Sequence, residues 1–251
     1  MEFGAHTDRI TVDQDILPLF VVKSTDPAEL VSFAGTGFLI APRILVTCWH
    51  CVKNMLPEGC RYAAVRSNGA GGHQALHLAH IEQDKQGSDL ATAHIEASPT
   101  LGLKVAEGDV AVGTDVFSYG YPLTDVGRRA AGGMQFTLHA RYLRGYVMRA
   151  FWYEHPQFGR VASYEVDMQT PEGLSGAPLI RRGSWDVVGV VYGTNEVASI
   201  AEFARHDPET DERTPELQRI VGFGLAHYTG TLHSLRTEAT RDLPLSQFLR
   251  S

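Results

Sequence analysis

The chain has 251 residues, a length that suits one or two domains. Its apolar content of 43% and charged content of 20% are ordinary for a globular protein, so wholesale disorder is excluded. A formal net charge of −7 disfavours binding to nucleic acid phosphates. No apolar run approaches the ~18 residues that a membrane span needs. We therefore expect neither nucleic acid nor a membrane as a partner.

The cysteine count and the start of the sequence bear on the compartment. Three cysteines cannot all pair within one chain. The first apolar run, residues 16–22, follows acidic rather than basic residues, so it does not have the pattern of a secretory leader. Both observations predict reduced thiols and a cytoplasmic location.

Short apolar runs recur along the chain, and most of them are bounded by Gly, Pro, Asn or Asp. This pattern favours an all-β protein built as a sandwich or from barrels. A composition shift near residues 108–113 is the best place to divide the chain. The expected strands are 16–23, 33–40, 44–47, 77–81, 90–95, 115–119, 146–151, 164–168, 177–180, 187–192 and 222–226.

Helical signals are few and lie near the C-terminus. Thr214, followed by Pro215 and an acidic first turn, predicts the start of a helix. The tail over residues 231–241 is also expected to be helical, with Pro244 limiting its continuation. The acidic stretch 196–216 indicates a surface insertion, either a lid or a solvated loop.

Three motifs carry possible chemistry. His50 follows a predicted strand, and Asp89 begins another. Ser175 lies between Gly173 and Gly176, and such a turn can point two backbone N–H groups into one small space, as an oxyanion requires. Singly, these residues are more often structural, but their order His–Asp–Ser is one of the known orders of a catalytic triad.

At these positions the chain resembles the trypsin-like (chymotrypsin-fold) serine peptidases, especially bacterial members without disulfides. Residues 47–51, 88–91 and 173–178 stand where that family has its histidine, aspartate and serine motifs. The resemblance covers residues 12–245. It implies two antiparallel β-barrels, over residues 1–112 and 113–251, with a short C-terminal helix and the active site in the crevice between the barrels.

The resemblance assigns catalytic roles to His50, Asp89 and Ser175, and an oxyanion hole to the N–H groups of Gly173 and Ser175. It implies a serine endopeptidase that acts on a protein or peptide, with no metal or organic cofactor. The expected substrate-binding pocket is formed by four residues, which are Gln169, Tyr192, Thr194 and Gly222.

Departures from the family pattern refine these expectations. Leu174 replaces the aspartate that pairs with a freshly cut amine in zymogen-activated relatives, so we expect regulation through loops or a protein partner instead. Cys51 lacks its usual disulfide partner, which would sit near Gly35. Gln169 is neutral, which favours a neutral or small apolar side chain at P1, the substrate residue before the scissile bond.

Three other hypotheses stay open at this point. Cys48 and Cys51 form a C-x-x-C pair that would suit thiol–disulfide exchange. The same pair with His73 and His77 would suit structural zinc. A catalytically silent member of the fold would act as a binding module, because a fold does not fix an activity.

Overall fold

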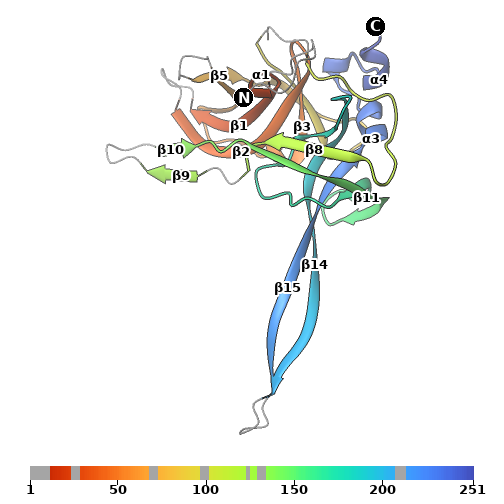
Figure 1. Ribbon diagram of the computed structural model, residues 1–251. Helices are drawn as coiled ribbons and strands as arrows, with labels where there is room; N and C mark the ends of the chain where they lie inside the picture. Colours follow the sequence, from red (N-terminus) through yellow and green to blue (C-terminus); the bar gives the residue numbers. More distant parts are fainter. Residues whose placement is uncertain are drawn as a thin grey trace.

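The computed structural model describes residues 12–23, 29–67, 73–96, 102–122, 125–128, 134–206 and 213–251. It contains two main β-sheets, and every pairing between named strands is antiparallel (Figure 1). The expected all-β, chymotrypsin-like double fold is therefore confirmed.

The first sheet has seven strands in the order β5-β4-β1-β2-β3-β7-β6 and forms a half-barrel. Its third strand, β1, is an apolar run whose first seven residues are buried, as the sequence predicts for a strand covered on both faces. The strands of this sheet are β1 (Ile16–Lys23), β2 (Glu29–Ala41), β3 (Ile44–Cys48), β4 (Cys60–Ser67), β5 (His73–His77), β6 (Ala79–Gln83) and β7 (Leu90–His94).

The second sheet closes into a six-stranded barrel in the order β11-β12-β15-β14-β13-β8. A separate two-stranded sheet joins β9 (Asp125–Arg128) to β10 (Met134–Thr137). The barrel strands are β8 (Asp115–Gly120), β11 (Arg141–His155), β12 (Gly159–Val166), β13 (Pro178–Arg181), β14 (Val187–His206) and β15 (Arg213–Tyr228).

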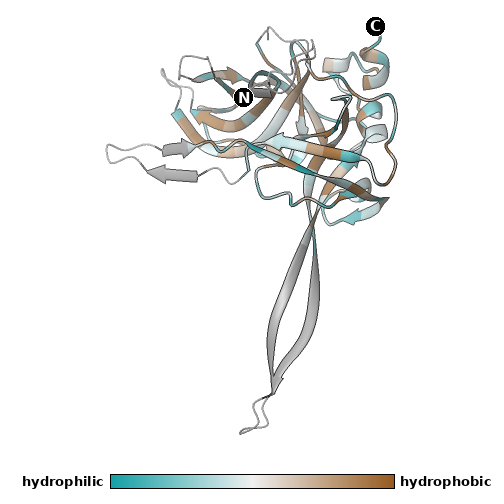
Figure 2. Cartoon of the chain, viewed as in Figure 1, coloured by the Kyte–Doolittle hydropathy of each residue, from teal (hydrophilic) through white to brown (hydrophobic). Residues whose placement is uncertain are grey.

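Apolar side chains pack inside the barrel and between the two sheets. Figure 2 shows hydrophobic residues along the strands of both sheets. Tyr164 and Leu179 fill the barrel interior and are fully buried. A larger core joins β1, β2 and β3 to Val190 and Leu225 of the barrel, so the two sheets share one apolar interface. The crevice that holds the site lies along this interface.

The described part of the acidic stretch 196–216 is strand rather than a solvated loop. Strands β14 and β15 pair as one hairpin from Glu196 and Gly222 out to His206 and Arg213, and residues 207–212 lie outside the described residues. Figure 1 shows this hairpin extending far from the barrel. The predicted helix at Thr214 is therefore wrong, because pairing with β14 places that residue in a strand.

The chain ends in short helical segments that pack on the first sheet. Leu235 and Leu245 are fully buried in the shared core, and the hydroxyl of Thr92 donates to that of Thr237 at 2.8 Å. The helix expected over 231–241 is thus shorter and begins earlier. The helices are α1 (Val12–Asp15), α2 (Trp49–Val52), α3 (Thr229–Ser234) and α4 (Leu245–Phe248), with a 3-10 turn over Glu238–Thr240.

Among the described residues, no helix is long and apolar enough to cross a membrane. The domain boundary expected near residues 108–113 falls between β7 and β8 and stays a prediction.

Candidate active site

His50 and Asp89 are brought together by two neighbouring strands of the first sheet. Cys48, at the end of β3, pairs with Leu90, at the start of β7. The next residues continue this contact, because the Trp49 N–H donates to the Asp89 carbonyl at 2.9 Å. Helix α2 then presents His50 to the Asp89 carboxylate.

The two side chains form a direct ion-pair contact. The imidazole Nδ1 of His50 donates to Oδ2 of Asp89 at 2.7 Å, and the backbone N–H of His50 donates to Oδ1 at 2.9 Å. The Asp89 side chain is 1% exposed, whereas that of His50 is 28% exposed. The carboxylate is thus buried behind the ring and fixes which ring nitrogen carries the proton, leaving Nε2 as the proton acceptor.

Burial and hydrogen bonding act in opposite directions on this pair. Burial alone lowers the pKa of His50, but the hydrogen bonds with Asp89 and Cys51 outweigh it and raise that pKa from 6.5 to about 10. Burial alone raises the pKa of Asp89, but the nearby His227 ring and the hydrogen bond with His50 lower it to about 2. The pair is therefore strongly biased towards carboxylate and imidazolium.

Ser175 comes from the second barrel and is held against the first sheet by backbone contacts. The Thr36 N–H donates to the Ser175 carbonyl at 2.9 Å, and the Thr36 hydroxyl donates to the Gly173 carbonyl at 2.9 Å. The turn before β13 is thereby placed at the junction of the two sheets.

The two glycines of this turn are required by its geometry. Gly173 and Gly176 have φ angles of +92° and +86°, in the region that favours glycine. A Cβ on Gly176 would lie 2.0 Å from the Thr36 carbonyl oxygen, and one on Gly173 would lie 2.7 Å from the Phe33 ring. Glycine thus permits the close approach of the turn around Ser175 to the first sheet.

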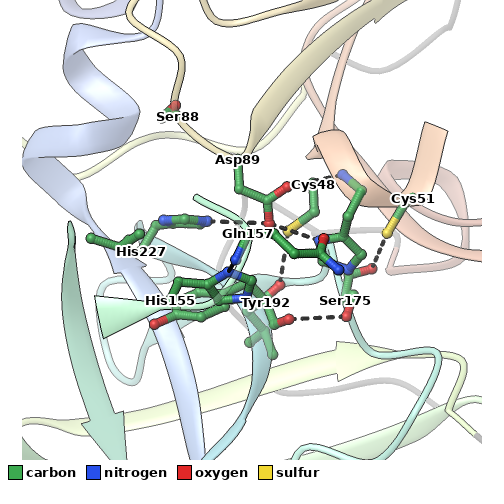
Figure 3. Close-up of polar contacts among 12 residues, drawn as sticks. Cys48, Cys51, Ser88, Asp89, His155, Gln157, Ser175, Tyr192 and His227 are labelled. Carbon is green, nitrogen blue, oxygen red and sulfur yellow. Dashed lines mark hydrogen bonds and ion pairs between the residues drawn. The ribbon is translucent and has the colours of Figure 1, made fainter. Parts of the chain in front are cut away.

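The Ser175 hydroxyl is hydrogen-bonded to a backbone carbonyl in this conformation. It donates to the Tyr192 carbonyl at 3.3 Å, while the Cys51 thiol points at the Ser175 carbonyl at 3.6 Å (Figure 3). The structure therefore joins His50 to Asp89 directly and places Ser175 in the same site with its hydroxyl on a different acceptor.

Backbone donors around Ser175 divide into two sets. The N–H groups of Leu174 and Gly176 donate to the carbonyls of Pro171 and Val191 at 3.1 Å and 2.8 Å. Among the described residues, no group accepts from the N–H groups of Gly173 or Ser175. These are the two donors predicted for the oxyanion hole.

Three of the expected pocket residues lie on two paired strands, Tyr192 and Thr194 on β14 and Gly222 on β15. The fourth, Gln169, lies in the segment before Ser175. Gln169 is exposed, whereas its neighbour Thr170 is buried. The Thr170 hydroxyl donates to the Gly193 carbonyl at 2.5 Å, and the Thr194 hydroxyl donates to the Thr170 carbonyl at 2.7 Å. Thr170 thus ties the segment before Ser175 to β14. It was not predicted from the sequence, because the family motif points to the position six residues before the serine, which is Gln169.

Aromatic residues form a wall beside the imidazole. The tip of the β11–β12 hairpin brings Phe158 to 6.4 Å from the His50 ring, and His155 packs between Phe158 and Tyr192 at 4.7 Å and 5.8 Å between ring centroids. The Lys53 ammonium donates to the Gln157 side-chain oxygen at 3.0 Å and ties this tip to the first sheet.

A hollow of about 300 Å³ is lined in part by His50. Its lining also includes Phe33, Cys51, Tyr62 and the fully exposed side chain of Met55. The imidazole therefore borders both this hollow and the aromatic ring of Phe158.

All three cysteines are free thiols. A Cβ on Gly35 would lie 2.8 Å from the Cys51 sulfur, so Gly35 stands where a disulfide partner would be. The Cys48 thiol instead donates to the Val191 carbonyl at 3.3 Å. Cys48 and Cys51 thus point to different carbonyls, which does not favour a redox pair.

The zinc hypothesis is not supported by the positions of its four residues. The strand order places β5, with His73 and His77, four strands away from β3 and Cys48, which is ~19 Å at the usual strand spacing. Cys48, Asp89 and His227 do have potential ligand atoms within 4.8 Å of one another, all buried. Here the carboxylate is already engaged by His50.

Comparison with protein families agrees with this geometry. The model of the trypsin-like peptidase domain matches residues 35–190. The chain belongs to this family. No curated protein sequence matches the chain.

This trypsin-like peptidase domain also aligns with solved protease structures. The Rv3671c protease of M. tuberculosis, in its inactive form, aligns with a TM-score of 0.55 and 19% identity over 87% of this chain and 85% of that one. The MamO protease domain of Magnetospirillum magneticum aligns with a TM-score of 0.55 and 18% identity, over 88% and 95%. At these identities the likeness shows the shared fold.

Proposed function

We propose that the chain is a serine endopeptidase in which Ser175 is the nucleophile, His50 the general base and Asp89 the group that orients His50. The observation that carries the proposal is the buried Asp89 carboxylate, 2.7 Å from His50 Nδ1, at the junction where the Ser175 turn meets the first sheet. Membership of a peptidase family supports the same reaction class.

The reaction begins with attack of the Ser175 oxygen on the scissile carbonyl while its proton passes to Nε2 of His50. The carbonyl oxygen becomes an oxyanion, which the N–H groups of Gly173 and Ser175 stabilise. Collapse of this intermediate breaks the C–N bond, and His50 returns the proton to the leaving amine. Water then repeats the sequence on the acyl-enzyme, releasing the acid and regenerating the Ser175 hydroxyl.

This mechanism requires one change from the conformation described. The Ser175 hydroxyl must leave the Tyr192 carbonyl, at 3.3 Å, and turn towards His50. We expect this change to be a rotation about the Ser175 side-chain bond, because Thr36 holds the backbone of the turn.

Labelling with a fluorophosphonate tests the proposal directly. We expect covalent modification of the intact chain on Ser175, and loss of labelling in Ser175→Ala. His50→Ala should label far more slowly, because its base is missing. Ser184→Ala, an exposed serine of the same barrel, is the matched control and should label like the unmodified protein. Labelling that survives Ser175→Ala would contradict the assignment.

One observation favours a second candidate, a catalytically silent binding module. The Ser175 hydroxyl is engaged by a backbone carbonyl rather than by His50. If that hydrogen bond is permanent, the intact protein will bind peptides without labelling or turning them over. The fluorophosphonate experiment therefore separates the two candidates.

We propose a small, uncharged P1 residue. The hydrogen bonds of Thr170 to Gly193 and Thr194 hold the segment before Ser175 against β14, and exposed Gln169 supplies no charge for Arg or Lys. Peptides that differ only at P1 should be cleaved faster with Ala or Val than with Arg, Lys or Phe. A preference for Arg or Lys would contradict this proposal.

We also propose that a protein partner or a protein substrate uses the β14–β15 hairpin. The hairpin starts at Thr194 and Gly222, in the predicted pocket wall, and extends away from the barrel (Figure 1). Replacing residues 197–221 by Asn-Gly should preserve the barrel, because Glu196 and Gly222 are paired and a two-residue turn can join them. Short peptides should be cleaved as before, while cleavage of the target protein falls. Unchanged kinetics on both would refute a role for the hairpin.

The predicted cytoplasmic location is retained as part of this proposal. Its support is the chemistry of the thiols, because all three cysteines are free and Gly35 occupies the position of a disulfide partner. Fractionation of cells that produce the protein, followed by thiol labelling, tests the location.

A further inference from the structure

His227 is held in the barrel wall directly behind the catalytic carboxylate. It lies near the end of β15, where it pairs with Ser163 of β12 and with Val190 of β14. Its side chain is 0% exposed. Figure 3 shows the ring directed at Asp89, and Nε2 lies 3.8 Å from Oδ2 of that carboxylate.

The hydrogen-bonding capacity of this ring is unused at the distances described. Neither Nδ1 nor Nε2 of His227 has a hydrogen-bond partner among the described residues. Leaving a buried donor unpaired is costly, and a carboxylate oxygen can accept more than one hydrogen bond. A closing movement of less than an ångström would give Nε2–H a charged acceptor in Asp89.

The neighbours of His227 hold it in place without competing for this contact. The Tyr192 ring packs against it with centroids 4.5 Å apart, and the Tyr192 hydroxyl is engaged with Ser163 at 2.6 Å. The nearby Cys48 thiol donates to the Val191 carbonyl. Asp89 is thus the acceptor towards which the packing directs the ring.

We propose that His227 is a positioning residue, which donates from Nε2 to Asp89 and fixes the carboxylate in the orientation that His50 requires. This inference rests on the proposed function, because the positioning matters only if His50 and Asp89 act in catalysis. It gives Asp89 a histidine on each side, His50 from the first sheet and His227 from the barrel.

The charge balance of the site is consistent with this role. The titratable groups facing the Asp89–His227 contact are His50 from α2, Cys48 from β3, Tyr192 from β14 and His155 from β11, with Lys53 further out. Burial raises the pKa of Cys48 well above its usual range and raises that of Tyr192, so both stay neutral near pH 7. His227 is therefore the donor on the barrel side that can stabilise the carboxylate charge.

Two substitutions separate positioning from simple packing. His227→Phe keeps a ring but has no donor, and His227→Gln keeps an N–H donor. We expect His227→Phe to lower kcat by about 10- to 100-fold, the range of a hydrogen bond to a charged group, with little change in KM. The acid limb of its pH profile should shift, and His227→Gln should recover most of both effects. Equal loss in both variants with an unshifted pH profile would overturn the proposal.

A measurement that needs neither turnover nor a variant of His227 completes the test. In ¹⁵N-histidine-labelled Ser175→Ala protein, NMR should show a proton on Nε2 of His227 and a hydrogen bond from it to a carboxylate. A proton on Nδ1 alone would overturn the proposal even if His227→Phe does not fold. Absence of fluorophosphonate labelling in the unmodified protein would count against the proposed function, while the NMR result still decides the role of His227.

Discussion

Replacing Asp89 by asparagine tests the centre of the mechanism with the smallest change in shape. Two donors of His50, Nδ1 and the backbone N–H, converge on this carboxylate at 2.7 Å and 2.9 Å. An asparagine can still accept from the backbone N–H, but its amide then donates towards Nδ1. His50 would carry its proton on Nε2 and could not accept one from Ser175.

The expected magnitude follows from the charge that Asp89 stabilises. The rise in the pKa of His50 from 6.5 to about 10 corresponds to about 4–5 kcal/mol in favour of the imidazolium, since each factor of ten is 1.36 kcal/mol. In the proposed mechanism the imidazolium forms as Ser175 attacks, so the part of this stabilisation that Asp89 contributes is lost in Asp89→Asn, while the part from Cys51 remains. We expect kcat/KM to fall by about 10³- to 10⁴-fold, the size seen for this substitution in a serine-protease triad.

The assay is kcat/KM on a peptide amide, with the rate of fluorophosphonate labelling as a second measure. Asp84→Asn is the matched control, because Asp84 is also buried but accepts from Ser88 and Arg236 rather than from His50. Both variants should retain cooperative unfolding. If Asp89→Asn keeps more than about a tenth of the activity, the tautomer argument is refuted.

Three further predictions follow from the same structure. Activity should increase with pH through a midpoint above 6.5, because His50 must be neutral to act as a base and its pKa is raised; a midpoint at or below 6.5 would contradict this. The Asp89 carboxylate should stabilise the fold above its unfolded pKa of 3.8, and this stabilisation should be lost as the pH falls towards about 2. Comparing the acid unfolding of the unmodified protein with that of Asp89→Asn measures this contribution. Gly176→Ala should lower the free energy of unfolding by about 3–5 kcal/mol, from backbone strain and the clash with Thr36. Gly183 also has a positive φ, +96°, but a Cβ there would meet no atom within 4 Å. Denaturant unfolding of Gly183→Ala should therefore show a loss of only about 1–2 kcal/mol in the free energy of unfolding, from backbone strain alone. Equal losses in Gly176→Ala and Gly183→Ala would refute the clash with Thr36.

The sequence predicts the fold class well because strand length and turn residues are local signals. The buried run of β1 and the barrel strand β13 lie close to where the apolar pattern puts them. Strand β4 was missed, because a charged and a polar residue interrupt its apolar run. The hairpin was missed for a different reason, since pairing between β14 and β15 overrides the helix-start signal at Thr214.

In the site, too, local motifs were readable from the sequence, whereas contacts between distant strands were not. His50, Asp89 and Ser175 were identified by their motifs and their order, and the contact of His50 with Asp89 is present in the structure. Thr170 and His227 carry no motif. Their neighbours depend on strand register across the barrel, which one sequence does not reveal.

The backbone hydrogen bond from Thr36 to Ser175 has a consequence for what this protein can cut. The turn that carries Ser175 is hydrogen-bonded to the first sheet, so moving the two sheets apart to admit a bulky folded chain would break the contacts that hold the proposed site together. A scissile bond must instead arrive on an extended segment that threads through the fixed opening. Targets with exposed loops, frayed ends or unfolded stretches would then be cleaved, and tightly folded proteins would be spared.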